Sequence, residues 1–192
     1  ALAAASRDFK IVGAFDQGEA LTKSSLKGRG VLIDFSGPAG TSTASAYAQK
    51  AGWGLVVGTT GLDPMIEKAL SAAAKKIPIV RSSNMSVGVN LMLTLVREAA
   101  KRFSDDFTIH MEETHHIHKK DAPSGTALML LKSLADAKKW TSARTAKERE
   151  RIRSIREGEV VGDHRVIFQG PAETVEITHR AHSRDTFAGG AL

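Results

Sequence analysis

Apolar residues in the first half of the chain come in short runs, separated by stretches that read as helical or as loops. The runs are typical of buried strands and lie at residues 9–15, 31–35, 55–57 and 77–81. Helices are expected between later runs, one through residues 44–51 and one from Asp63 and Pro64, a good cap and first-turn pair, to Lys75. Strands alternating with helices favour a parallel sheet with crossover helices. The first half therefore predicts a doubly wound, Rossmann-like α/β domain.

The pattern changes in the second half of the chain. Apolar residues recur at helical spacing over 89–103, and polar and apolar residues then alternate over 107–112 as in a half-buried strand. A further helix is expected at about 126–137. Beyond a polar stretch, two strands are expected at 160–168 and 174–181, which the turn Gly170-Pro171 would join into an antiparallel hairpin. This mixture predicts a second, α+β domain with a mixed sheet.

The net charge of +6 at pH 7 fits a nucleic acid, an anionic membrane, or an acidic small molecule used with a phosphate-bearing cofactor. The basic residues are scattered except over 138–156, and only 5% of residues are aromatic, which argues against a nucleic-acid partner. No apolar run approaches the ~20 residues that cross a bilayer. The first residues lack the order of a signal peptide. The absence of cysteine fits a reducing cytoplasm. We therefore expect a cytoplasmic protein with a small-molecule partner, no nucleic acid and no membrane.

The strongest site signal is the polar segment from Glu113 to Ala127, where a strand gives way to a helix. Ser124 can cap this helix, and the N–H groups of Gly125 and Thr126 then point outward with the positive end of the helix dipole. Such a helix start suits a carboxylate, and Lys119 adds a positive charge. Imidazole titrates near neutrality, so a histidine beside this lysine is suited to act as a general acid.

Two other interpretations of the histidines in this segment remain open. They could be ordinary loop residues; these histidines are His115, His116 and His118. Alternatively, His116, His118 and Asp121 are close enough in sequence for zinc, and a zinc hydrolase could then use the cluster from His115 to His118. Zinc would have to sit among lysines and a helix N-terminus, so we expect no metal.

Candidate cofactor contacts follow the predicted strands of the first half. In an open parallel sheet, ligands bind beyond the carboxyl ends of the strands. Small residues there form the turn Gly58-Thr59-Thr60-Gly61 and the loop Ser82-Ser83-Asn84-Met85. Asp16 ends the first predicted strand, where a carboxylate can accept hydrogen bonds from an adenosine ribose and would repel a 2′-phosphate. Each feature taken alone could be a tight turn or a solvated strand end.

The segment from Glu113 to Ala127 closely resembles the signature of the dihydrodipicolinate reductase family, in which two adjacent histidines are followed by a lysine and an Asp-Ala-Pro-Ser-Gly-Thr sequence. The resemblance continues through other motifs in the family's order, at residues 33–36, 58–61, 83–90, 161–164 and 176–179. It implies an NAD(P)H-dependent enzyme that reduces a cyclic unsaturated dicarboxylate in diaminopimelate and lysine biosynthesis. It also implies two domains in a homotetramer, with NADH or NADPH as cofactor.

The resemblance also assigns roles by motif position. His115 corresponds to the proton donor and Lys119 to its partner in catalysis. The implied substrate contacts are His116, Gly125 and Thr126. The implied cofactor contacts are Gly58, Thr59, Thr60, Ser82, Ser83, Asn84 and Met85, with Asp16 at the ribose. Gln17 stands where some relatives carry an arginine, which favours NADH. A non-catalytic dinucleotide-binding module is the alternative, but it would be expected to lack the His115 and Lys119 pair.

The resemblance further implies domain limits and missing parts. We expect a dinucleotide-binding domain at 1–84, a substrate-binding and oligomerisation domain at 85–183, and a segment at 184–192 that starts the return to the first domain. The family's first strand, its glycine-rich Gly-x-x-Gly-Arg-Met-Gly turn and its last helices have no counterpart in this sequence. We therefore expect the chain to be part of a longer protein.

Overall fold

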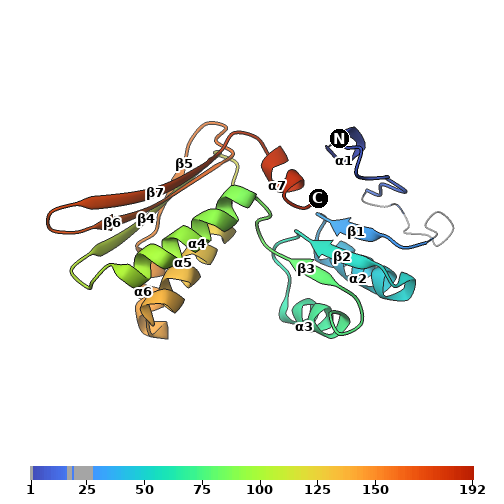
Figure 1. Ribbon diagram of the computed structural model, residues 1–192, viewed down its shortest axis with the longest axis horizontal. Helices are drawn as coiled ribbons and strands as arrows, with labels where there is room; N and C mark the ends of the chain where they lie inside the picture. Colours follow the sequence, from blue (N-terminus) through green and yellow to red (C-terminus); the bar gives the residue numbers. More distant parts are fainter. Residues whose placement is uncertain (1, 17–18, 20–27) are drawn as a thin grey trace. The chain divides into compact units, whose positions relative to one another are not determined.

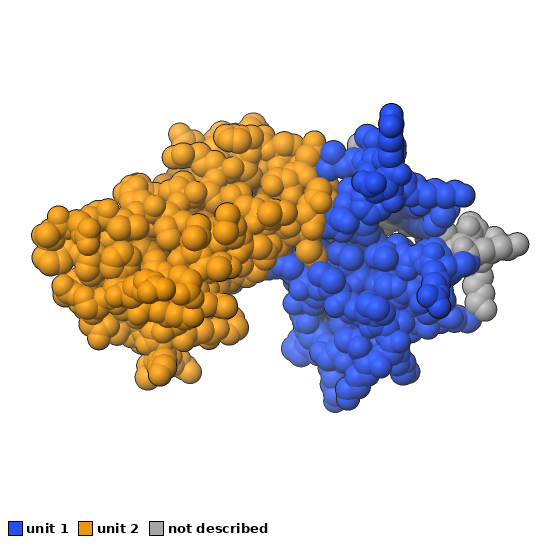
Figure 2. Space-filling model, viewed as in Figure 1, with its two compact units in different colours: residues 1–83, 191–192 blue, residues 84–190 orange. Residues whose placement is uncertain are grey.

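The computed structural model describes residues 2–16, 19 and 28–192, so Gln17 lies outside the described residues. The chain divides into two compact units, one of Ala1–Ser83 with Ala191–Leu192 and one of Asn84–Gly190 (Figure 2). The domain limit that we expected after residue 84 is one residue from this division. None of the described helices is long and apolar enough to span a bilayer.

The first unit is built on a parallel sheet (Figure 1). Its strands are β1 (Val31–Asp34), β2 (Gly54–Val57) and β3 (Ile79–Arg81), in the order β1-β2-β3. The described helices are α1 (Leu2–Ala5), α2 (Pro38–Ala51) and α3 (Pro64–Ala73). Apolar side chains of α2, α3 and β2 share one core, in which Leu55 and Val57 are almost fully buried. The Asp63 carboxylate accepts a hydrogen bond from Ile66 N and caps α3, as predicted.

The prediction of a strand at residues 9–15 is wrong, because this segment has no regular secondary structure. A strand is stable only when its backbone groups pair with a neighbour. In the part of the chain that the structure describes, no strand pairs with this segment. Its apolar side chains are accordingly exposed, and they are Phe9, Ile11, Val12 and Phe15.

The second unit is built on a mixed sheet of order β5-β4-β6-β7 (Figure 1). Its strands are β4 (Thr108–His115), β5 (Arg153–Arg156), β6 (Gly162–Gln169) and β7 (Thr174–Ala181). Strand β5 runs parallel to β4, whereas β6 pairs antiparallel with both β4 and β7. The helices are α4 (Val87–Arg102), α5 (Gly125–Lys138), α6 (Ser142–Glu150) and α7 (Asp185–Gly189). The mixed sheet and its antiparallel hairpin confirm the predicted α+β architecture.

Helices α4 and α5 pack on one face of this sheet and form the larger core. Val96 of α4, Leu134 of α5 and Phe168 of β6 are each fully buried there. Burying side chains of this size contributes roughly 1.5–3 kcal/mol each. The two helices are therefore held firmly over the sheet, and the start of α5 is fixed near the carboxyl end of β4.

The buried face of β4 changes from apolar to polar along the strand. Successive residues point to opposite faces, so Met111, Glu113 and His115 share the buried face. On the neighbouring strand β6, His164 lies directly opposite Glu113 in the antiparallel register. The sheet thereby brings three titratable side chains together in its interior.

Candidate active site

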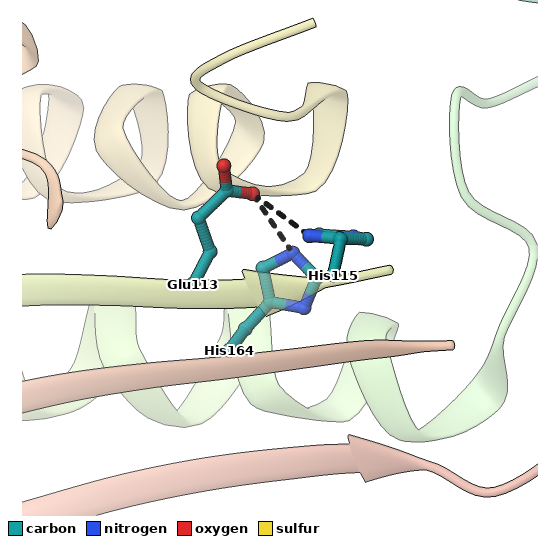
Figure 3. Close-up of side chains that lie close together, drawn as sticks. All are labelled: Glu113, His115 and His164. Atoms are coloured by element: carbon teal, nitrogen blue, oxygen red, sulfur yellow. Dashed lines mark ion pairs between the residues drawn. The ribbon is translucent and has the colours of Figure 1, made fainter. Parts of the chain in front are cut away.

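Glu113, His115 and His164 form a buried cluster at the carboxyl end of β4 (Figure 3). Glu113 Oε2 lies 3.3 Å from His115 Nδ1 and 3.9 Å from His164 Nε2. The two imidazole rings stand edge to face, with their centroids 5.1 Å apart. These three side chains could transfer or hold a proton in a site largely closed to water.

Glu113 is stabilised as a carboxylate, although it is only 1% exposed. Its Oε2 accepts a hydrogen bond from Ser124 N at 3.2 Å, and its Oε1 accepts one from Arg156 Nη2 at 3.2 Å. Burial alone would raise the pKa of Glu113, but the polar side chains of His115, Ser124 and Ser154 outweigh burial and hold that pKa well below its usual range. Glu113 therefore carries a negative charge at neutral pH.

His164 is the neutral histidine of the cluster. Burial lowers its pKa to about 3, and the positive charge that His115 can carry acts in the same direction. Its Nε2 lies 3.1 Å from Ser124 Oγ, so its ring is tied to the start of α5. This histidine is suited to hold Ser124 in place and unsuited to donate a proton at neutral pH.

His115 stands between the carboxylate and a glycine. Its Nδ1 faces Glu113, and a Cβ atom on Gly162 would come within 3.0 Å of its Nε2. Any side chain at position 162 would thus crowd Nε2 of His115, the ring nitrogen on the side away from Glu113. Because Gly162 has no side chain, it leaves room beside Nε2 for a ligand.

The loop between β4 and α5 carries Lys119. Its Nζ donates to Asp121 Oδ1 at 2.7 Å, and the Lys119 side chain is 21% exposed. Burial alone would raise the pKa of Asp121, but the hydrogen bond and charge of Lys119 outweigh burial, and the pKa lies below its usual value. Arg156 of β5 fixes the loop backbone, because its guanidinium donates to the carbonyl oxygens of both Lys119 and Asp121. This loop holds a cation beside the buried cluster.

The start of α5 also joins this region. Ser124 caps the helix by accepting a hydrogen bond from Ala127 N, as predicted. Thr126 Oγ1 accepts a hydrogen bond from Asn84 Nδ2 at 2.8 Å. The N–H groups of Gly125 and Thr126 have no acceptor within the helix, so together with Lys119 they can bind an anion.

The possible zinc ligands within the loop do not gather around one point. His118 is exposed and lies 3.7 Å from Glu159, and Asp121 is paired with Lys119. The ligand-type atoms that do converge belong to Glu113, His115 and His164, all within 4.8 Å of one another. A cation there would face the Arg156 guanidinium, which already binds Glu113. The Arg156 guanidinium would thus repel a metal ion bound to Glu113.

In the first unit, Thr59 of the candidate cofactor turn contacts a buried carboxylate, Asp34 of β1. Asp34 accepts hydrogen bonds from Thr41 Oγ1 at 2.6 Å and from Thr59 Oγ1 at 3.0 Å. Thr59 is buried, whereas Thr60 is exposed. Asp16 is also exposed, and its backbone N–H donates to the Glu19 carboxylate.

Sequence reasoning missed Glu113, Arg156 and His164 as members of the site. A signal for Glu113 was present, because it continues the alternation that placed Ile109 and Met111 on the buried face. An acidic residue at an inward strand position needs a partner, which is itself a sign of function. Arg156 lies on β5, a short edge strand that its own sequence does not reveal.

Comparison with known proteins agrees with this architecture. Residues 2–85 match the family model described as dihydrodipicolinate reductase, N-terminus, and residues 88–192 match the model described as dihydrodipicolinate reductase, C-terminus. The 4-hydroxy-tetrahydrodipicolinate reductase of Desulfovibrio desulfuricans is 45% identical over 174 residues, which cover 84% of this chain and 67% of that protein. The enzyme of the same name from Nitrosomonas europaea is 43% identical over 181 residues, which cover 88% and 68%.

A solved structure supports the fold. The dipicolinate-bound dihydrodipicolinate reductase of Paenisporosarcina sp. TG-14 has a TM-score of 0.67 and 23% identity, over 83% of this chain and 65% of that one. This chain thus spans about two thirds of the length of the relatives it matches. Because the two family models together cover nearly all of its residues, the chain belongs to the dihydrodipicolinate reductase family.

Proposed function

We propose that the protein containing this chain is a 4-hydroxy-tetrahydrodipicolinate reductase, which reduces a cyclic unsaturated dicarboxylate in diaminopimelate and lysine biosynthesis. The observation that carries the proposal is the pairing of His115 with a buried, ionised Glu113 beside a loop that holds Lys119. That arrangement supplies a proton donor and a cation within one short stretch of chain.

The substrate carboxylates would be bound by groups around the start of α5. The first-turn amides of Gly125 and Thr126 present partial positive charge, and Lys119 presents a full one. His116 lies on the same loop, directly after His115. Lys119 is paired with Asp121 in the structure, so it would exchange this partner for a substrate carboxylate.

His115 would donate the proton that completes the reduction. Its Nδ1 faces the Glu113 carboxylate, so Nε2, next to Gly162, is the nitrogen available to the substrate. The cofactor carries the reducing equivalent, so the main task of the protein is to hold the proton donor and the two substrate carboxylates in fixed positions.

The residues of the first unit fit a nicotinamide cofactor. The carboxyl ends of its parallel strands lead into small residues at 58–61 and 82–83. Small residues at that edge of a parallel sheet let a cofactor approach the backbone. The proposed contacts are Gly58, Thr59, Thr60, Ser82, Ser83, Asn84 and Met85. The bound cofactor, NADH or NADPH, supplies the hydride.

We expect NADH to be preferred over NADPH. The Asp16 carboxylate, which we propose to contact the adenosine ribose, would repel a 2′-phosphate. The Michaelis constants of the two cofactors, measured with the full-length protein, test this expectation. A clearly lower value for NADPH would contradict it.

We also propose that the protein is a cytoplasmic homotetramer that requires no metal. The Arg156 guanidinium, which already binds Glu113 in the histidine cluster, supports the absence of a metal requirement. Activity that persists after treatment with a chelator is the expected result. Loss of activity that zinc restores would instead show a metal requirement.

The reductase assignment is tested with the full-length protein. The substrate is made in place from pyruvate and aspartate semialdehyde by an added synthase, and NADH or NADPH oxidation is followed by absorbance. Oxidation that depends on the synthase is expected. Cofactor binding without any oxidation would favour a non-catalytic dinucleotide-binding module.

A further inference from the structure

Glu113 is linked to both members of the proposed catalytic pair, directly to His115 and through Arg156 to the backbone of Lys119. Its Oε2 lies 3.3 Å from Nδ1 of His115, and its Oε1 accepts a hydrogen bond from Arg156. Arg156 in turn donates to the carbonyl oxygens of Lys119, at 3.2 Å, and of Asp121. One buried side chain thus reaches the proton donor directly and the backbone of the lysine loop through a single intermediary.

We propose that Glu113 is the positioning residue of this site. It orients His115, places a negative charge against Nδ1 of that histidine, and fixes the Lys119 loop through Arg156. The proposal rests on the proposed function, because it assigns Glu113 a part in the same proton transfer.

Stability alone does not account for a carboxylate at this position. Glu113 is 1% exposed, and burying a charged group is costly unless it is paired and hydrogen-bonded. Met111, two residues earlier on the same face, shows that an apolar side chain fits the buried side of β4. Replacing a buried ion pair by apolar residues is often neutral or stabilising. A buried ion pair next to a titratable histidine therefore points to function.

The charge balance around His115 gives Glu113 a specific task. His115 faces Glu113 on its own strand and His164 from β6. Arg156 from β5 binds Glu113, and Lys119 of the following loop is paired with Asp121. Burial holds His164 neutral, and Arg156 and Lys119 are cations that disfavour a second positive charge. Of these groups, Glu113 is the one that places a negative charge against Nδ1 of His115. Without its charge, the donor would lose its proton more readily.

The test compares two identical changes on adjacent residues of β4. Glu113→Gln keeps the shape of the side chain and removes its charge. The matched control is Glu112→Gln, since Glu112 lies on the opposite face, where it forms ion pairs with Arg153 at 3.3 Å and Arg165 at 3.4 Å. Both variants are made in the full-length protein, and kcat, KM and thermal unfolding are measured from acid to alkaline pH.

Glu113→Gln is expected to lower kcat by about 10- to 100-fold, a large part of the contribution of a general acid, with KM for the dicarboxylate changed only about twofold. The pH at which kcat falls on the alkaline side should move down by about one unit, because the charge that favours the proton is gone. Glu112→Gln should leave all of these quantities at their wild-type values. An unchanged kcat in Glu113→Gln, or a lower kcat with an unchanged pH profile, would overturn the proposal.

Two further measurements keep the proposal testable. If Glu113→Gln does not fold, the double variant Glu113→Gln with Arg156→Met removes the unpaired guanidinium, and its pH profile is compared with that of Arg156→Met alone, from which it differs only in the Glu113 charge. The alkaline decline of kcat should lie at lower pH in the double variant, and equal profiles would overturn the proposal. The titration of His115 is also followed by NMR without ligands, with its signal assigned by loss in His115→Ala. Its midpoint should be lower in Glu113→Gln than in the wild type and in Glu112→Gln. Equal midpoints would overturn the proposal, even if the wild type proved to lack reductase activity.

Discussion

The two units each contain a buried carboxylate near the end of a strand, but the two carboxylates have different neighbours. Asp34 of β1 accepts hydrogen bonds from Thr41, Thr59 and the backbone of Ser36, all of them neutral donors. Glu113 of β4 accepts from the Arg156 guanidinium and faces two imidazoles. A carboxylate among neutral donors shapes a turn, whereas one among titratable groups also controls where a proton resides.

The hydrogen bonds of Asp34 have a structural consequence for the proposed cofactor site. Thr41 belongs to α2, and Thr59 belongs to the turn after β2, so Asp34 joins three segments at the carboxyl end of the sheet. We infer that Asp34 maintains the conformation of the turn at residues 58–60, whereas Glu113 affects proton transfer by His115. Changes at the two sites should therefore separate into effects on stability and effects on proton transfer.

The largest expected effect is that of His115→Ala on turnover. Loss of the proton donor should lower kcat by roughly 100- to 10,000-fold, with little change in cofactor affinity. Steady-state kinetics and a cofactor titration measure the two quantities. His118→Ala is the matched control, because His118 is exposed on the adjacent loop, and it should retain nearly full turnover. Unchanged turnover in His115→Ala would refute the assignment of His115 as the acid.

The next effect concerns the dependence of stability on pH. His164 has a pKa of about 3 in the folded protein and about 6.5 when unfolded. Below about pH 6.5 the unfolded chain binds a proton that the folded chain rejects, so stability should fall as pH decreases from 6.5 towards 3. One such group changes the free energy of unfolding by up to about 1.4 kcal/mol per pH unit. Urea unfolding should show a shallower decline in His164→Gln, and equal slopes would show that His164 is not the group responsible.

The smallest expected effect is that of Asp34→Asn. The change weakens hydrogen bonds to Thr41 and Thr59 without leaving a charged partner behind, so the loss of stability should be about 1–2 kcal/mol. Urea unfolding measures the loss. The pH profile of turnover should keep its wild-type position, in contrast to that of Glu113→Gln. A shifted profile would break the distinction between the two carboxylates.

The sequence predicted well the elements whose apolar residues are periodic or whose ends carry clear caps. Asp63 and Ser124 both cap helices as expected, and the hairpin around Gly170-Pro171 is present. These elements depend on local interactions and on burial of one face. Such information lies within a short window of residues.

Elements that depend on distant partners were predicted less well. Residues 9–15 have the composition of a strand but no neighbour to pair with among the described residues. Strand β5 has the opposite character, because the sequence Arg-Ser-Ile-Arg lacks apolar alternation and forms a strand only through its pairing with β4. For the same reason the residues His115 and Lys119 were identified from their local motif, while Arg156 and His164 were not.

The most direct test of the central claim is the pH dependence of kcat for the full-length wild-type protein and for its His115→Ala variant. If His115 delivers the proton, the wild type should lose activity on the alkaline side, and the residual activity of the variant should lack this decline. If Lys119 or another group delivers the proton, the same alkaline decline would remain in the variant, and the roles assigned to His115 and Glu113 would be contradicted.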